Sequence, residues 1–173
     1  KLEADDFICK FSDFMRGSLN HSDKIITSLH EEIEFVENFI QLQRIRFNNR
    51  FDYKIDIDER VNRNTKVPKH IIFSYVENAI KHGLSKSKEK GLLQIKASVQ
   101  DTKLLLVIQD NGPGILTGSS PGKDSTGSGL RIMEEMYVLF YKLYKKKIEH
   151  KVIELFDQEQ NKTGVKVELL ISK

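Results

Sequence analysis

The sequence predicts an α+β fold, a two-layer α/β sandwich in which a mixed, mainly antiparallel sheet carries helices on one face, preceded by an N-terminal helical segment. Two observations lead to this prediction. Apolar residues repeat at helical spacing in several separate segments, and short apolar or alternating segments follow one another closely enough to pair as neighbouring strands. With 173 residues, the chain is long enough for one domain with a helical attachment and a core that needs no metal or disulfide.

Composition excludes several classes of protein. The net charge of +3, from 28 basic and 25 acidic residues, gives little reason to expect a nucleic-acid partner. No apolar run approaches the ~20 residues of a membrane span, and the first residues do not form a signal peptide. The single cysteine, Cys9, rules out an internal disulfide framework and fits a reducing compartment. The opening KLEADDF, which lacks a methionine, favours a segment of a longer protein.

Residues 1–47 are predicted to form the helical segment. Phenylalanines at helical spacing indicate a first helix over residues 7–19, and the pattern stops within residues 20–27. A second helix is expected over residues 28–47, where a broad apolar stripe continues for several turns.

The start of this second helix carries a recognisable signal. Ser28 and Glu31 have the spacing of a capping box, in which each side chain pairs with the backbone of the other residue. The acidic residues that follow are expected on the solvated side of the helix; the acidic set is Glu31, Glu32, Glu34 and Glu37.

Residues 48–173 are predicted to form the sheet domain. Apolar and charged residues alternate in the first strand, and Asp101 and Thr102 separate two apolar runs as a hairpin turn would. The expected elements are a strand over 51–57, a helix over 68–83 with Pro68 in its first turn and Gly83 as its stop, a hairpin over 92–99 and 103–109, a helix over 129–145, and a closing hairpin over 148–157 and 164–172.

The helix over 68–83 has a polar face of unusual composition. Asn78 lies mid-helix, where an amide competes with the backbone, and it forms an i,i+4 pair with His82 as Glu77 does with Lys81. An amide oxygen suits Mg²⁺, and lysine and histidine suit phosphate oxygens. A ligand site and an ordinary solvated face both remain open. The expected polar face comprises His70, Ser74, Glu77, Asn78, Lys81 and His82.

Glycine concentrates in a stretch that begins directly after an apolar strand. Asp110 ends that strand, and Gly112 and Gly114 follow it. A carboxylate there can accept a hydrogen bond from an amine while the glycines let the backbone close over a ligand. A simple turn is the alternative interpretation. Because loops longer than about 12–15 residues are uncommon in compact domains, this stretch is the first place to look for function.

A second glycine pair, Gly127 and Gly129, opens the helix over 129–145. Free backbone N–H groups at a helix start favour phosphate, and glycine permits close approach; a flexible loop leading into a helix is the alternative. Two familiar phosphate motifs are excluded. The segment from Gly118 to Asp124 lacks the spacing and the Ser or Thr of the Walker pattern, and no glycine group completes a dinucleotide GxGxxG.

Three segments together resemble the ATP-binding domain of the gyrase, chaperone, histidine-kinase and mismatch-repair ATPase superfamily. Residues 77–83 (ENAIKHG) resemble its N box, residues 110–114 (DNGPG) its first glycine box, and residues 127–130 (GSGL) its second. The chain is most similar to the LytS-like sensor histidine kinases, whose linker helix resembles residues 29–47. The resemblance covers residues 7–172.

The resemblance implies the ligands ATP and Mg²⁺ and a role for each matching residue. Asn78 would coordinate the Mg²⁺, Glu77 would polarise the attacking group, and Asp110 would accept a hydrogen bond from the adenine amine. Residues 111–128 would form a lid over the nucleotide. The remaining expected contacts are Lys81 and His82 with the phosphates, Gly112 and Gly114 around the adenine, and Gly127, Gly129 and Leu130 at the phosphates.

The chain also departs from the family pattern. No histidine has the proline-histidine-phenylalanine setting of the phosphoacceptor, and residues 1–19 resemble the second dimerisation helix, so we expect the acceptor upstream of Lys1. Such a chain is expected to bind Mg²⁺-ATP without phosphorylating itself. The last glycine box of the family is Gly-Thr, whereas Thr163-Gly164 reverses that order.

The implied function is transfer of the ATP γ-phosphate to a histidine of a two-component sensor kinase. The implied partners are a response regulator, the protein's own upstream phosphoacceptor domain and a second copy in a homodimer, in a cytoplasmic domain of a membrane-anchored parent. A nucleotide-dependent interaction module and an anti-sigma-type protein-serine kinase are the alternatives. Nucleic-acid binding would rest only on the lysines of residues 142–151 and is not expected.

Overall fold

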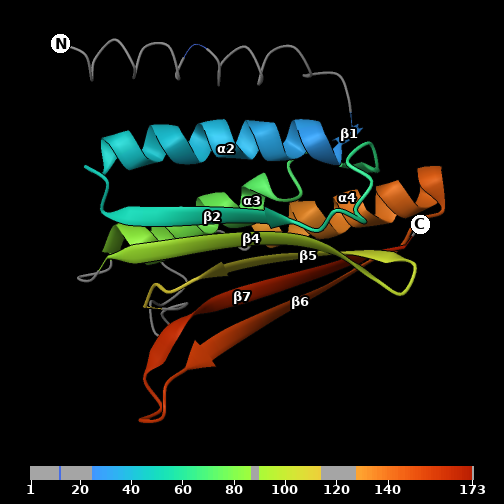
Figure 1. The fold of residues 1–173 in the computed structure, drawn as a ribbon. Coiled ribbons are helices and arrows are strands. Elements are labelled where there is room, and N and C mark those ends of the chain that lie inside the picture. The colour runs from blue at the N-terminus through green and yellow to red at the C-terminus, as the bar shows by residue number, and fades with distance from the viewer. Residues whose placement is uncertain (1–11, 13–24, 87–89, 114–127, 173) are drawn as a thin grey trace.

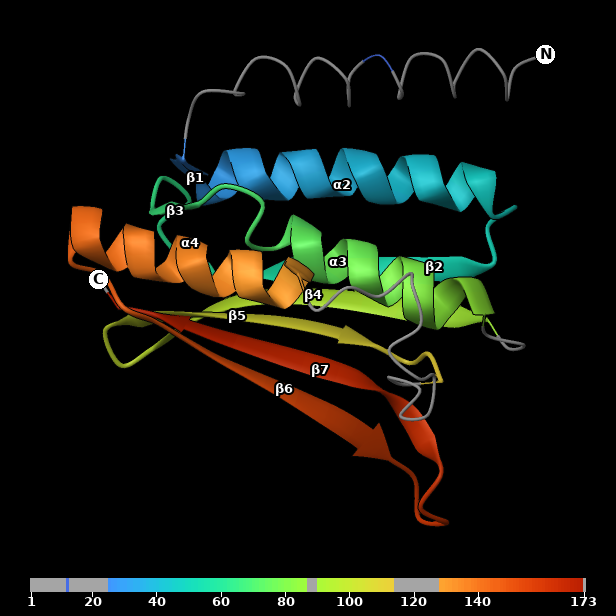
Figure 2. The same ribbon diagram turned by 180° about the vertical axis from the view of Figure 1, so that it is seen from behind.

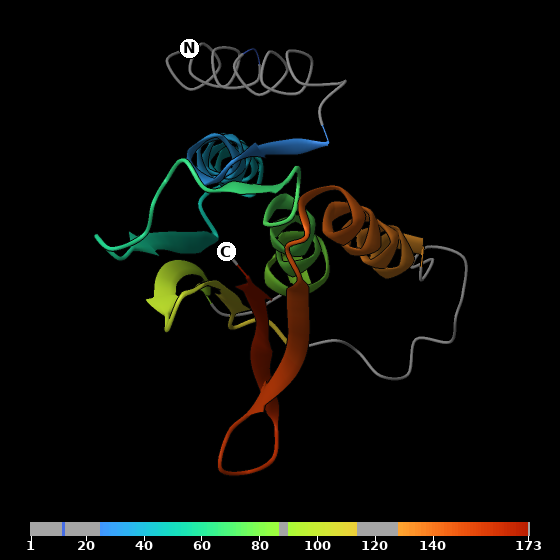
Figure 3. The ribbon, with the colours of Figure 1, turned by 90° about the vertical axis from the view of Figure 1, so that its right-hand side faces the viewer.

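The computed structural model describes residues 12, 25–86, 90–113 and 128–172, with only the helical backbone described at 86 and 128–132. It is a two-layer structure in which a twisted sheet carries its helices on one side (Figures 1 and 3). The first helix predicted by the sequence, over residues 7–19, lies outside the described residues apart from Ser12. The α+β prediction is confirmed for the rest of the chain.

The main sheet has five strands in the order β2-β4-β5-β7-β6. The pair β2 and β4 is parallel and the other three pairs are antiparallel, as expected for a mixed, mainly antiparallel sheet. The strands are β2 (Phe51–Ile57), β4 (Gly91–Gln100), β5 (Lys103–Asp110), β6 (Ile148–Phe156) and β7 (Lys162–Ile171). Asp101, with φ of 54°, makes the turn between β4 and β5.

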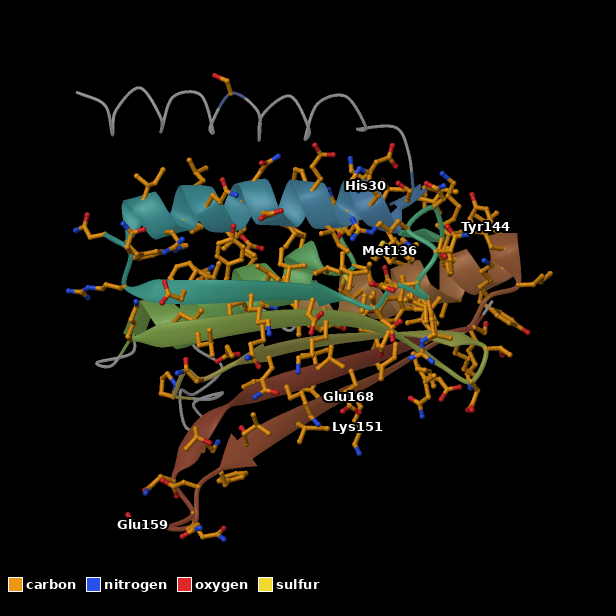
Figure 4. All side chains as sticks on the ribbon, viewed as in Figure 1. His30, Met136, Tyr144, Lys151, Glu159 and Glu168 are labelled. Carbon is orange, nitrogen blue, oxygen red and sulfur yellow. The ribbon has the colours of Figure 1, made fainter. Side chains whose placement is uncertain are left out.

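Alternation along the strands separates the two faces of the sheet. In β5, buried and half-buried residues alternate from Leu104 to Asp110, and the buried ones face the helices. On the other face, Lys151 of β6 is paired with Glu168 of β7 (Figure 4). Figure 4 also shows Glu159 at the tip of the β6–β7 hairpin, which extends beyond the helical layer.

Two long helices cover the sheet. α2 (Leu29–Arg46) begins with the predicted capping box, in which Ser28 accepts from the Glu31 N–H at 3.2 Å and Glu31 accepts from the Ser28 N–H at 2.8 Å. α4 (Ser128–Tyr144) agrees with its predicted bounds. Within the described part of the chain, no helix has the length and apolarity needed to cross a membrane.

The prediction that Pro68 lies in the first turn of a helix is wrong. Pro68 ends the short strand β3 (Lys66–Pro68), which pairs with β1 (Ile26–Ser28) in a separate two-stranded sheet. A proline suits this terminal strand position because it has no N–H to contribute to a ladder. The helix α3 begins only at Phe73, after His70 has turned the backbone to φ of 65°.

The prediction that Glu32 lies on a solvated face is also wrong. Glu32 is only 2% exposed, and its carboxylate accepts hydrogen bonds from the backbone N–H groups of His70, Ile72 and Phe73 at 2.9, 3.0 and 3.2 Å. Burial raises the pKa of the Glu32 carboxyl, and these three hydrogen bonds act in the opposite direction. The first turn of α3 is thus capped by a side chain from another helix.

The N-box helix also changes form along its length. α3 (Phe73–Asn78) is α-helical, residues Ala79–Gly83 form a π-helical turn, and Leu84–Lys86 form a 3₁₀ turn. Sequence periodicity predicts one continuous helix here, because it cannot detect where the hydrogen-bonding pattern widens. Such π-helical turns are rare and often coincide with functional sites.

Candidate functional site

Asp110 lies at the end of β5 with its carboxylate facing the helical layer. It is 5% exposed, and its Oδ1 accepts a hydrogen bond from the Gly112 N–H at 2.8 Å. Burial raises the pKa of Asp110 to about 6, and the Gly112 hydrogen bond lowers it in part. A carboxylate that is buried with little hydrogen-bonding compensation is an unusual feature, and strongly perturbed acids of this kind cluster at functional sites.

Two glycines from separate parts of the chain enclose this carboxylate. A Cβ on Gly83, the last residue of the π-helical turn, would lie 2.9 Å from the Asp110 Oδ1, and a Cβ on Gly112 would lie 2.8 Å from the same atom. The two glycines also face each other, since a Cβ on Gly112 would lie 2.6 Å from the Gly83 Cα. Any larger residue would fill the space beside the carboxylate or displace the helix from the strand end.

A third glycine, Gly164, packs against the backbone of Asp110. The sequence indicated it only as part of the reversed motif Thr163-Gly164. Gly164 has φ of 155°, and a Cβ there would overlap the Asp110 carbonyl oxygen. Thr163, on one side of it, is exposed, and Val165, on the other, pairs directly with Asp110 across the two strands. Among the hydrogen bonds of the described residues, none joins a hydroxyl of either neighbour to the Asp110 carboxylate.

The polar face of the N-box helix leads away from Asp110. Glu77, Asn78 and Lys81 are exposed, and His82 is half-buried. Asn78 is the last residue of α3, and the π-helical turn joins it to Gly83. Asn78 therefore lies five positions before the residue that contacts Asp110. The structure thus brings the predicted N-box residues and Asp110 to one end of the molecule.

His70 does not belong to this polar face, and the expectation that it would is wrong. It precedes α3, and its ring packs against Phe35 and Phe73 at centroid distances of 5.1 and 5.3 Å. Burial lowers the pKa of His70, and its buried Nδ1 has no hydrogen-bond partner in the described structure. The positive φ at this residue turns its side chain toward α2 instead of toward the polar face.

The helix that follows the glycine-rich stretch runs beside α3 in the opposite direction (Figures 2 and 3). The two helices are joined by a buried hydrogen bond of 2.9 Å between the hydroxyls of Tyr75 and Tyr137. Gly129 lies in the first turn of α4, and the start of this helix faces the end of the molecule at which β5 ends (Figure 2). Gly114, Gly127 and residues 114–127 of the expected lid lie outside the described residues, as does the side chain of Leu130.

Sequence comparisons identify relatives of one kind. A family model described as "Histidine kinase" matches residues 1–51. The LytS sensor protein of Oceanobacillus iheyensis is 30% identical over 112 residues, which are 65% of this chain and 19% of that protein. The LytS sensor protein of Staphylococcus saprophyticus is 34% identical over 113 residues, with the same coverage. The chain thus spans about a fifth of the length of these curated relatives.

Solved structures with a similar fold are more distant in sequence. The catalytic domain of histidine kinase ThkA aligns with a TM-score of 0.52 at 20% identity, covering 86% of this chain and 95% of that one. The histidine kinase domain of the Erythrobacter litoralis EL346 blue-light activated histidine kinase aligns with a TM-score of 0.57 at 16% identity, covering 96% and 79%. At this level of identity the likeness concerns the fold.

Proposed function

We propose that this chain is part of a LytS-like sensor histidine kinase, binds Mg²⁺-ATP between Asp110 and Asn78 and presents its γ-phosphate to a histidine. One observation carries the proposal. The buried carboxylate of Asp110 is held between Gly83 and Gly112, and Gly83 ends the same helical segment that carries Asn78. One helical segment therefore links a group suited to the base with a group suited to the metal.

The surroundings of Asp110 fit an adenine. Its carboxylate is an acceptor, the adenine amine is a donor, and a buried acceptor pairs strongly with a donor that completes its hydrogen bonding. The two glycines let the helical segment and the strand end approach the carboxylate closely, where a Cβ would interfere. Because guanine carries a carbonyl oxygen where adenine carries this amine, the same carboxylate would discriminate against guanine.

The surroundings of Asn78 fit a magnesium ion that is shared with phosphates. An exposed amide oxygen is a hard ligand, and Mg²⁺ in such sites retains waters and takes few protein ligands beside the phosphate oxygens. The neighbouring cation, Lys81, is exposed on the same helical segment and would neutralise phosphate charge, with His82 beside it. We assign Lys81, His82 and the start of α4, including Gly129 and Leu130, to phosphate binding.

Phosphoryl transfer depends mainly on positioning and on neutralising charge. Bound Mg²⁺ supplies charge neutralisation across the phosphate oxygens. Asp110 holds the base, Lys81 offsets negative charge on the transferred group, and Glu77 is positioned on the exposed face to accept a proton from the attacking histidine. Residues 111–128 would exclude water above the nucleotide.

The partners follow from the relatives. A histidine kinase delivers its phosphoryl group onward, so we propose a response regulator as the acceptor protein, an upstream phosphoacceptor domain as the histidine donor, and a homodimer of the complete protein. We further propose a cytoplasmic domain of a membrane-anchored parent.

Phosphotransfer can be tested with γ-labelled ATP. The full-length protein is expected to form an acid-labile, base-stable phosphohistidine, whereas the 173-residue chain is expected to bind Mg²⁺-ATP without labelling itself. An acid-stable phosphoserine product would favour the protein-serine kinase alternative. Binding of nucleotide without any phosphoprotein in the full-length protein would favour the interaction module.

A further inference from the structure

Glu32 connects α2 with the start of α3, and the proposed function does not involve this contact. It lies on α2, the helix that follows the N-terminal segment, yet its carboxylate accepts from His70, Ile72 and Phe73 at the start of α3. These residues are 38 to 41 positions away in the sequence. Glu32 itself is 2% exposed, so this is a buried anchor and not a surface contact.

The start of α3 depends on this carboxylate for its hydrogen bonding. The residue in the N-cap position is Ile72, which has no side-chain acceptor, and α3 has no side-chain cap of its own. The N–H groups of Ser74 and Tyr75 bond to the carbonyls of His70 and Ile72, whereas the N–H groups of Ile72 and Phe73 bond to Glu32. Without Glu32, two buried or half-buried donors at the first turn would lose their acceptor.

Aromatic packing reinforces the same junction. The Phe73 ring lies 4.9 Å from the Phe39 ring and 5.3 Å from the Phe35 ring, and both partners belong to α2. The His70 ring packs beside them. α2 and the first turn of α3 are therefore held together by packing as well as by hydrogen bonds.

The N-box segment, here α3 together with the π-helical turn (residues 73–83), is held in place at both of its ends. Its start is fixed to α2 through Glu32, and its end is fixed to the sheet where Gly83 meets Asp110. The change from α-helix to π-helix falls between Asn78 and Ala79, so Asn78 lies on the α2 side of that change. Lys81 lies on the other side, nearer Asp110.

We infer that Glu32 is a positioning residue for Asn78, and that the α2–α3 junction makes metal-dependent nucleotide binding respond to displacements of α2. The inference rests on the proposed function. The change of helix type between Asn78 and Ala79 separates the part of the segment held by α2 from the part that meets Asp110. Release of the Glu32 anchor therefore disturbs the group assigned to the metal while the base contact at Asp110 is retained.

The substitution Glu32→Gln tests whether Glu32 affects metal-dependent binding at Asn78 without affecting the base contact at Asp110. It keeps the size of the side chain, removes its charge and replaces one acceptor oxygen with an NH₂ donor. The matched control is Glu31→Gln, one position away, whose carboxylate accepts hydrogen bonds from Thr27 and Ser28 at the start of α2. Calorimetry measures two affinities in each variant, one for a non-hydrolysable Mg²⁺-ATP analogue and one for ADP with a chelator.

Glu32→Gln is expected to weaken binding of the Mg²⁺ analogue by at least about tenfold and to leave metal-free ADP within about twofold of wild type. Glu31→Gln is expected to leave both affinities within about twofold. A Glu32→Gln protein that weakens both ligands by the same factor, or neither, would overturn the positioning role. A purely structural role predicts lower stability without this selective loss.

Two further measurements keep the test decisive. If Glu32→Gln does not fold, Glu32→Asp retains the charge with a shorter reach and is expected to show the same selective loss. Amide hydrogen exchange without nucleotide is expected to accelerate in residues 74–78 of Glu32→Gln and to stay unchanged in residues 80–83. Uniform exchange along the segment would contradict the inference, whereas wild-type failure to bind the Mg²⁺ analogue would contradict the proposed function alone.

Discussion

The two ends of the candidate site differ in how completely the folded chain forms them. At the base end, Asp110 is buried and three glycines fix its side chain and backbone. At the phosphate end, Asn78 and Lys81 are exposed on a segment that changes from α-helix to π-helix. The base end is therefore formed by packing before any ligand arrives, and the phosphate end is left for metal and phosphate to complete. Substitutions at the base end should affect stability, and those at the phosphate end should affect binding.

The largest loss of stability is expected from Gly164→Ala. The added Cβ would overlap the Asp110 carbonyl oxygen, and the backbone there has φ of 155°, which an alanine rarely adopts. We expect a loss of at least about 3 kcal/mol in the free energy of unfolding, measured by chemical denaturation.

Thr163→Ala is the matched control for this substitution, because Thr163 is the exposed neighbour on the same strand. It should change stability by less than about 0.5 kcal/mol. If Gly164→Ala lowered the free energy of unfolding no more than this control does, the close packing of β7 on the Asp110 backbone would not be needed to hold Asp110 in place.

The next largest effect is a pH-dependent gain of stability from Asp110→Asn. The pKa of Asp110 is raised from 3.8 to about 6 in the folded protein, so folding favours the protonated acid. Stability from this group is fully present below pH 3.8 and is lost as the pH rises through about 6. A neutral amide avoids this loss and should be more stable than wild type by up to about 3 kcal/mol at pH 7.

Denaturation of both proteins across this pH range checks the sign of the effect. The difference in unfolding free energy between Asp110→Asn and wild type should be near zero at pH 3.5 to 4 and should reach its maximum above about pH 6. A variant that is less stable than wild type at pH 7 would show that the carboxylate contributes to the fold, which contradicts a group buried for function.

A smaller effect is expected from Tyr137→Phe, at the contact between α3 and α4. The substitution removes the partner of the buried Tyr75 hydroxyl while keeping the ring. The free energy of unfolding should fall by about 1 kcal/mol. An exposed tyrosine on the same helix provides the control, because Tyr141→Phe should be neutral. Equal effects of the two changes would mean that the hydroxyl pair does not hold α4 against the N-box helix.

Much of the fold was predictable because its signals are local. Alternation located β2, two apolar runs around Asp101 and Thr102 located β4 and β5, and the Ser28–Glu31 spacing located the start of α2. Asn78 was predicted as a site residue because an amide is unfavourable mid-helix, and Asp110 because a carboxylate at a strand end, with glycines beyond it, can accept a hydrogen bond from a ligand. The resemblance to the ATPase superfamily implied their roles. The structure places the two at one end of the molecule, and their roles remain a proposal.

The rest depended on contacts between distant segments. Nothing near Pro68 in the sequence shows that it pairs in β3, or that the helix start depends on a glutamate from α2. Glu32 looks like one member of a solvated acidic series until its partners in the next helix are known. The approach of Gly83 and Gly112 to the Asp110 carboxylate, and of Gly164 to the Asp110 carbonyl oxygen, also requires the fold, since the sequence separates these glycines by tens of residues.

Calorimetry with a non-hydrolysable ATP analogue and its guanine counterpart, each with and without Mg²⁺, tests the central claim most directly. Asn78→Ala should lose the enhancement of binding by Mg²⁺ while keeping the preference for adenine and the wild-type stability, because its side chain is exposed. Asp110→Asn should lose the preference for adenine while keeping the enhancement by Mg²⁺. Undiminished Mg²⁺-dependent binding by Asn78→Ala, or equal binding of both bases by wild type, would contradict a single nucleotide held at both residues.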